Sequence, residues 1–298
     1  MYLSGKKILL INLSFLVRVR IFNVIMLILA MYVSAIFLFG DEKDIIENFK
    51  NIKLHGIILS SSLSAMAGYI INFFYDQEKD MVYRPISSII QRFISNGIAL
   101  RFYIFFNSIS LTIAALLSYR IFIFFLVYQF IIWFYSHKLS RIVFINNLTN
   151  SALLLFPFLA LFLYYENFSS YIIYLSEFLF IMVLIKDICK DLLSFKYDDL
   201  FNYNTLPNTL GIIPTKIILN ILICILIFIS IHLTFEPHLY EIRLYYLLTA
   251  LLSLGSTISI WITKSEYMQI LIFMIKFWIF LGTISLLFID GNPLTLHF

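Results

Sequence analysis

Two acidic stretches of the sequence have residue types and a spacing that suit metal-assisted chemistry. The first contains Asn72, Asp76 and Asp80, which are separated by four residues each. On a helix this spacing places the three side chains on one face. Pro85 follows shortly afterwards and predicts the end of the helix. Because Asn72 lies within an apolar run, we expect its amide to face protein or water rather than lipid.

The second stretch holds Asp187 and Asp191, again four residues apart, and Asp198 two turns further along the chain. If one helix continues through all three positions, the carboxylates project from nearly the same side. Lys186 and Lys190 stand directly before the first two acids. The stretch therefore combines a second line of carboxylates with adjacent cations.

Carboxylates in this pattern suit Mg²⁺, a hard ion that is usually held by one or two carboxylates together with substrate phosphates. Two such stripes could hold two or three ions and bind a diphosphate through them. Bare carboxylates would repel a diphosphate, so metal bridging is required. Arg84, Lys186 and Lys190 are candidates for direct phosphate contacts. The predicted metal ligands are Asp76, Asp80, Asp187 and Asp191.

A third polar group follows a later apolar run and supplies candidate substrate-binding residues. Tyr135, Lys138 and Arg141 offer a hydroxyl and two cations, and Asn147 follows them. Asn23 stands at the entrance to the first apolar run. Basic residues in such a loop are also expected from membrane orientation alone. The sequence contains no P-loop, no Gly-x-Gly-x-x-Gly and no histidine spacing typical of a zinc or haem site.

The elements that must position these residues are membrane-spanning helices. The sequence is 61% hydrophobic and 13% charged, with a mean hydropathy of +0.94. Soluble domains are about 45–50% apolar and about 25% charged, so lipid must cover much of this chain. The net charge of +4, without a long basic face, excludes a nucleic-acid-binding class. Nine apolar runs are predicted to span the membrane: 21–39, 56–75, 102–118, 121–134, 143–165, 170–186, 215–235, 244–263 and 270–289.

The distribution of basic residues gives these spans an orientation. With the N-terminus in the cytosol, the cytosolic segments hold 15 Lys and Arg residues and the opposite segments hold 5. This asymmetry follows the positive-inside rule, and it places both acidic stretches at the cytosolic face. We therefore expect one domain over residues 1–298, in the bacterial inner membrane, with the N-terminus and the active-site cap in the cytosol.

The polar stretches resemble the motifs of the UbiA superfamily of intramembrane prenyltransferases. The pattern Asn-x-x-x-Asp-x-x-x-Asp at 72–80 resembles the first aspartate-rich motif. The stretch 186–207, from Lys-Asp-x-x-Lys-Asp to Thr-Leu-Pro, resembles the second, most closely in the digeranylgeranylglyceryl phosphate synthase-like branch. The stretch 135–147 resembles the loop after the fourth span, and Arg-x-x-Asn at 20–23 resembles the opening motif. The resemblance runs in family order over roughly residues 18–215.

This resemblance implies an all-α integral membrane protein, a bundle of about nine transmembrane helices around a central cavity that the two motifs cap. It implies Mg²⁺, an allylic isoprenyl diphosphate donor and a membrane-associated acceptor. The diphosphate leaves with metal assistance, and the acceptor attacks the allylic carbon. The implied acceptor is a glycerophospholipid-type alcohol or an aromatic quinone precursor. Haem ranks lower, because only the first motif is similar to that of haem-farnesylating relatives.

The chain departs from the family pattern at several positions. Phe73 stands where Asp is usual, Ser140 where Lys is typical, Ser194 where an acid is frequent and Tyr197 where Gly is usual. A catalytically weakened paralogue that binds a lipid or a partner is therefore one alternative. A transporter with an acid-lined ion site is another. The acids cluster at one membrane face, however, whereas transport sites usually lie near the bilayer midplane.

Overall fold

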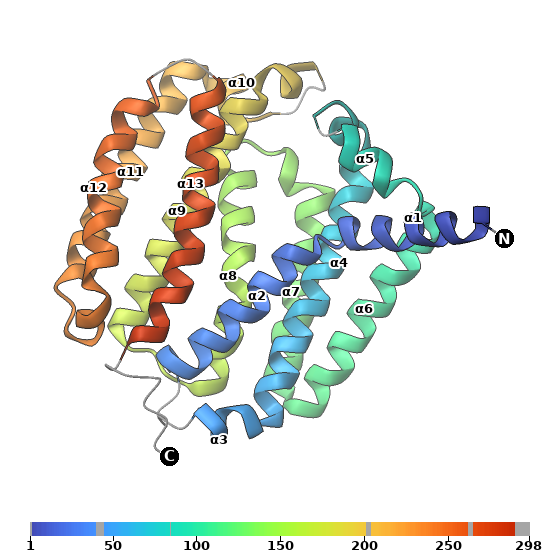
Figure 1. The fold of residues 1–298 in the computed structure, drawn as a ribbon, viewed down its shortest axis with the longest axis horizontal. Coiled ribbons are helices and arrows are strands. Elements are labelled where there is room, and N and C mark those ends of the chain that lie inside the picture. Colours follow the sequence, from blue (N-terminus) through green and yellow to red (C-terminus); the bar gives the residue numbers. More distant parts are fainter. Residues whose placement is uncertain (1, 40–44, 84, 201–203, 262–264, 290–298) are drawn as a thin grey trace. The chain divides into compact units, whose positions relative to one another are not determined.

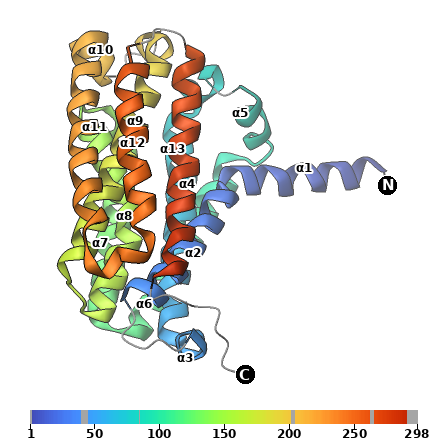
Figure 2. The ribbon, with the colours of Figure 1, turned by 60° about the vertical axis from the view of Figure 1, so that its left-hand side comes forward.

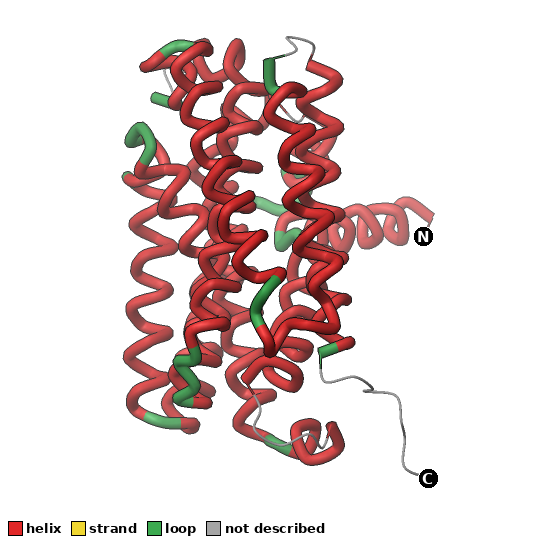
Figure 3. Tube along the Cα trace, turned by 90° about the vertical axis from the view of Figure 1, so that its left-hand side faces the viewer, coloured by secondary structure: helices red, strands yellow, loops and turns green. Residues whose placement is uncertain are grey.

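The structure, a computed structural model, describes residues 2–39, 45–83, 85–200, 204–261 and 265–289. Throughout these ranges the regular secondary structure is helical and no strand is formed (Figure 3). Eight of the described segments are long and apolar enough to cross a membrane. The predicted all-α, multi-pass membrane fold is thus confirmed. The eight segments are Ile21–Phe39, Ile52–Glu78, Asn96–Leu117, Tyr119–Arg141, Ile145–Tyr165, Ile212–Thr234, Pro237–Ser259 and Tyr267–Phe288.

Each of the eight corresponds to one predicted span, and the remaining predicted span, 170–186, forms the first part of a longer helix. This helix, α9, runs from Ser170 to Leu200. It contains Glu177 within its apolar part and the second acidic stretch in its later turns. Because α9 contains charged as well as apolar residues, it is not among the eight apolar segments.

The described chain divides into two compact units. Unit 1 comprises Met1–Tyr32 and Ile46–Ser140, and unit 2 comprises Val33–Ile45 and Arg141–Phe298. The organisation of 1–298 as one domain stays a prediction. The helices of unit 1 are α1 (Tyr2–Arg18), α4 (Ile52–Tyr83), α5 (Pro85–Gln91), α6 (Asn96–Leu117) and α7 (Tyr119–His137), while α2 (Ile21–Ser34) and α3 (Ile45–Lys50) contain the unit boundaries. The helices of unit 2 are α8 (Ile145–Tyr165), α9 (Ser170–Leu200), α10 (Leu206–Leu210), α11 (Ile212–Thr234), α12 (Arg243–Ser259) and α13 (Ser265–Ser285).

In unit 1, α4 packs against both α6 and α7 (Figure 1), and buried hydroxyls join the three helices. The Gln129 amide on α7 donates to Ser64 Oγ at 3.1 Å, and Ser64 Oγ lies 2.9 Å from Ser110 Oγ on α6. The Ser110 hydroxyl donates to the Ser60 carbonyl at 3.0 Å. Between membrane helices such hydrogen bonds replace contacts with lipid, which offers no partners. This Ser/Gln network therefore fixes how α4, α6 and α7 are rotated against one another.

Replacing Ser110 by Ala is expected to lower the free energy of unfolding by about 0.6–1.7 kcal/mol, the range for interhelical hydrogen bonds in membranes. The change leaves the Ser64 hydroxyl and the Ser60 carbonyl each without one contact. Unfolding by SDS titration in mixed micelles measures the loss. Ser108→Ala, at an exposed position of the same helix, is the control and should be neutral. Equal stability of both variants would contradict the role of the network.

The connection between α6 and α7 is a single residue. Ser118 ends α6, and its side chain accepts from the Ile121 backbone N–H at the start of α7. A serine at this position satisfies one of the free N–H groups of the first turn. The predicted spans 102–118 and 121–134 are therefore joined by a sharp turn between two helices.

Unit 1 begins with a helix that the sequence did not predict. In Figures 1 and 2, α1 lies across the direction of α4, with its first residues extending beyond the neighbouring helices of the unit. The Ser14 hydroxyl donates to the Gln91 carbonyl at 3.2 Å, which ties α1 to the end of α5. The chain then turns through Arg20, which has a positive φ of 50°, into α2.

Unit 2 is built around α9, which packs against α8, α11 and α13. Figure 2 shows α9, α11 and α12 running side by side. The Trp278 indole donates to Thr249 Oγ1 at 2.6 Å and links α13 to α12. A tight break at Gly211, with φ +94°, separates α10 from α11, and this conformation favours glycine. The unit thus holds α9 from several sides.

Candidate functional site

The second acidic stripe lies on α9 and is buried. Asp187, Asp191 and Asp198 are 5%, 4% and 0% exposed. The helix continues through all three positions, so the expected line of carboxylates on one side forms. Lys186 and Lys190 are half-buried on the same helix. The acids therefore lie within protein, in the turns of α9 that follow its apolar part.

Asn147, near the start of α8, joins two of these acids. Its Nδ2 donates to Asp187 Oδ2 at 3.1 Å and to Asp191 Oδ2 at 2.8 Å. The side chain is 1% exposed, and its Oδ1 has no hydrogen-bond partner among the described residues. The sequence indicated a substrate-binding role for Asn147, and the geometry adds a second one: it holds two carboxylates together.

The electrostatics of this pair favour a cation. Burial, and then the charge of Asp187, raise the pKa of Asp191 to about 7, and Lys190 offsets only part of this. One amide group cannot neutralise two buried carboxylates. The donor set consists of carboxylate oxygens and the unpaired amide oxygen of Asn147. These hard oxygen donors fit Mg²⁺.

Asp198 is held by its own helix. The Ser194 hydroxyl, one turn earlier, donates to Asp198 Oδ2. Ser194 is one of the departures from the family pattern. Here it supplies a hydrogen bond to the third acid of the stripe, which orients that carboxylate.

The first acidic stripe lies on the last turns of α4 in unit 1. The helix extends beyond the predicted span to Tyr83, so Asn72, Asp76 and Asp80 share one helical face as expected. All three side chains are half-buried. Pro85 is the first residue of α5, a position that suits proline because no intrahelical N–H is needed there. The predicted phosphate ligand Arg84 lies outside the described residues.

The remaining predicted binding residues lie near helix ends. Tyr135 is half-buried in the last turn of α7, Lys138 caps that helix and is exposed, and Arg141 is exposed in the short 3₁₀ turn Leu139–Arg141. Asn23 is exposed in the first turn of α2. Exposed cations at such positions can contact an anionic ligand. Their presence is equally explained by the positive-inside rule, which enriches Lys and Arg in cytosolic segments.

Neither unit, over its described residues, assembles three or more His, Cys, Asp or Glu side chains into a ready-made metal site. Mg²⁺ sites are commonly completed by substrate phosphates and water. A pair of carboxylates is therefore enough protein ligand for a Mg²⁺ ion of this kind. The two stripes belong to different units. That they bind one diphosphate together stays a prediction.

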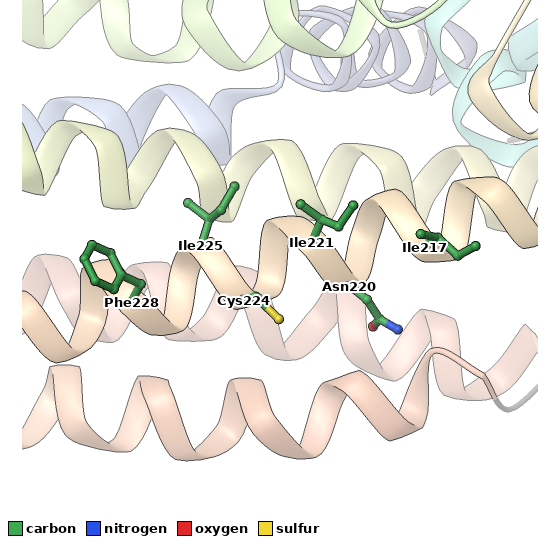
Figure 4. Close-up of a pocket in the computed structure, with 6 residues that line it drawn as sticks. All are labelled: Ile217, Asn220, Ile221, Cys224, Ile225 and Phe228. Atoms are coloured by element: carbon green, nitrogen blue, oxygen red, sulfur yellow. The ribbon is translucent and has the colours of Figure 1, made fainter.

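A groove on α11 has no acidic side chain among its lining residues. Figure 4 shows its lining, which is aliphatic or aromatic apart from one amide and one thiol. Such a lining suits lipid chains rather than a phosphate. The lining residues are Ile217, Asn220, Ile221, Cys224, Ile225 and Phe228.

Fold and site together define a multi-pass helical membrane protein with two acidic helix ends suited to Mg²⁺. A family model described as the UbiA prenyltransferase family matches residues 29–281. The chain belongs to the UbiA prenyltransferase family.

The chain is also similar to individual proteins. It is 32% identical over 185 residues to a digeranylgeranylglyceryl phosphate synthase of Saccharolobus solfataricus, a match covering 60% of this chain and 65% of that relative, less than two thirds of its length. A UbiA homologue of Archaeoglobus fulgidus, solved with GPP and Mg²⁺, matches with a TM-score of 0.65 and 17% identity, over 91% of this chain and 99% of the other. A structure concerned with digeranylgeranylglyceryl phosphate synthase in membranes matches with a TM-score of 0.64 and 15% identity, over 92% and 96%. At such identities the two structures establish the fold.

Proposed function

We propose that this protein transfers an isoprenyl group from an allylic isoprenyl diphosphate to a glycerophospholipid-type alcohol in the membrane. The observation that carries the proposal is the buried pair Asp187–Asp191 bridged by Asn147 on a UbiA fold. The family assignment disfavours the transporter alternative. Similarity to a digeranylgeranylglyceryl phosphate synthase favours the alcohol acceptor over an aromatic quinone precursor.

In this proposal the acids are metal ligands and the cations bind phosphate. Asp76 and Asp80 in unit 1, and Asp187 and Asp191 in unit 2, would hold Mg²⁺. The ion supplies charge neutralisation for the leaving diphosphate. The chain's own contribution is orientation: Asn147 keeps two carboxylates at fixed positions before substrate arrives.

The cations near the two acidic stripes are placed to contact the phosphate groups of the donor. Lys186 and Lys190 each stand directly before an acid of α9 and are themselves four residues apart, so their ammonium groups can reach an anion bound beside the acids. Lys138 and Arg141 add exposed positive charge near the helix ends. We place these residues in the bacterial inner membrane at the cytosolic face, where a water-soluble diphosphate group has access.

The test is release of diphosphate from geranylgeranyl diphosphate by the full chain in nanodiscs. We expect release that requires both Mg²⁺ and geranylgeranylglyceryl phosphate, because transfer needs a metal-assisted leaving group and a nucleophile. The lipid product is identified by mass spectrometry. 4-Hydroxybenzoate is the control acceptor. Turnover with 4-hydroxybenzoate alone would overturn the alcohol assignment, and no turnover with either acceptor, over a series of donor lengths, would support the weakened-paralogue alternative.

A further inference from the structure

A buried arginine holds the helix that carries the first acidic stripe. Arg18, the last residue of α1, is 2% exposed. Its guanidinium lies over the ring of Phe73 on α4, 4.6 Å from the ring centroid. Its Nη1 donates to the Ile94 carbonyl and its Nη2 to Asn96 Oδ1, both at 3.1 Å. One side chain thus connects α1, α4 and the start of α6.

Asn96 carries the connection back to α4. The Gln77 amide donates to Asn96 Oδ1 at 2.8 Å, and the Asn96 amide donates to Gln77 Oε1 at 3.3 Å. Phe73 and Gln77 are four residues apart, so they lie on one face of α4. Arg18 contacts Phe73 and Asn96 contacts Gln77, so the two residues restrain this face of α4 over one helical turn. Arg18 and Asn96 are also hydrogen-bonded to each other.

The held face is adjacent to the acidic stripe. Successive residues of an α-helix are rotated by about 100°, so Phe73 lies about 100° from Asn72, and Gln77 lies the same angle from Asp76. The last carbonyls of a helix lack intrahelical partners, and its final turn is the part most prone to fray. Contacts at Phe73 and Gln77 restrain the rotation of this end of α4, and with it the direction of the acids.

We propose that Arg18 is a positioning residue that aims Asp76 and Asp80 at their metal ion. The proposal rests on the proposed function, in which these acids bind Mg²⁺. Burial lowers the pKa of Arg18 to about 10, so the guanidinium remains a cation at neutral pH. A buried cation is costly unless its environment compensates for lost water. Here the ring of Phe73 and two oxygen acceptors supply part of that compensation, and the buried Nε has no hydrogen-bond partner among the described residues.

The test measures metal binding rather than turnover. Mn²⁺ replaces Mg²⁺, and electron paramagnetic resonance counts free and bound Mn²⁺ for the full chain in nanodiscs with inorganic diphosphate present. We expect Arg18→Ala to raise the Mn²⁺ Kd by about 10-fold, the lower end for loss of a residue that orients metal ligands. Arg18→Lys should be intermediate, because lysine keeps the charge and loses the planar, two-sided hydrogen bonding.

The control is Arg120→Ala. Arg120 is an exposed arginine that also lies near a ring, 6.0 Å from the centroid of Tyr119. It follows the end of α6, whereas Arg18 contacts the beginning of that helix. Its removal should leave the Kd unchanged.

Two readouts separate positioning from folding. Loss of folded protein lowers the number of Mn²⁺ sites and leaves their Kd unchanged, whereas loss of positioning raises the Kd. Phe73→Leu keeps an apolar side chain at this buried position and removes the ring face, so it should raise the Kd as well. Wild-type binding that Asp76→Asn weakens, but that Arg18→Ala and Phe73→Leu leave intact, would overturn the role of Arg18. Binding that Asp76→Asn does not weaken would overturn the metal-binding function of the stripe and this proposal with it.

Discussion

Replacing Asp191 by Asn is expected to lower kcat/KM for diphosphate release by about 10²- to 10³-fold, the loss typical of removing one electrostatic contact to a transition state. Asn is nearly isosteric, so packing around this 4% exposed position is retained while the negative charge is lost. Asp76→Asn should behave alike. The measurement is the rate of diphosphate release at saturating Mg²⁺ with donor and acceptor present.

The double variant Asp76→Asn, Asp191→Asn adds a test of cooperation between the stripes. Groups that act as one catalytic unit show strongly non-additive losses. We expect the double variant to be barely slower than either single variant. Glu177→Gln, at an exposed acid on α9, is the control and should keep full activity. An Asp191→Asn variant with more than a tenth of wild-type activity would contradict the assignment of this carboxylate as a metal ligand.

Replacing Asn147 by Leu is expected to weaken metal binding by about 10- to 100-fold. The change removes the amide that contacts Asp187 and Asp191 and leaves two buried carboxylates without this donor. Loss of a buried donor also lowers the free energy of unfolding by about 1–3 kcal/mol. Mn²⁺ titration gives the affinity, and SDS titration without metal gives the stability.

Asn147→Asp distinguishes bridging from ligation. An aspartate offers oxygen ligands but no N–H donor, so this variant should recover binding at high Mn²⁺, whereas the leucine variant recovers less. Asn150→Leu, one turn along α8 at a half-buried position, is the matched control. If Asn147→Leu bound Mn²⁺ as tightly as Asn150→Leu, the bridge would have no role in the site.

Most of the fold follows from the sequence because lipid imposes a simple rule on length and polarity. Eight predicted spans agree with eight apolar segments, with edges that differ by up to seven residues. The polar continuations of α4 and α9 are harder to predict as helix, because Asp and Lys interrupt the apolar pattern on which the prediction of a span depends. The helix α1 is not predicted for a different reason. Its apolar part, Leu9–Arg18, is too short to span a membrane.

The candidate site was predictable as residue types and less so as contacts. Spacing by four residues correctly placed Asp187 and Asp191 on one face of α9. The bridge from Asn147 depends on how α8 packs against α9, which helical spacing alone does not encode. The contact between Arg18 and Phe73 was missed likewise, although a charged residue immediately before an apolar run is a signal. Phe73, a departure from the family pattern, is a buried contact of that arginine.

The Ser/Gln network has a consequence for how the protein is made. Its members, Ser60, Ser64, Ser110 and Gln129, all belong to the first half of the chain. Chains fold from the N-terminus during synthesis, and these hydrogen bonds can close as soon as α7 has left the insertion machinery. Unit 1 can thus fix the rotation of α4 about its axis, and with it the direction in which Asp76 points. This can happen while the ribosome is still translating α9, the helix that carries the second stripe.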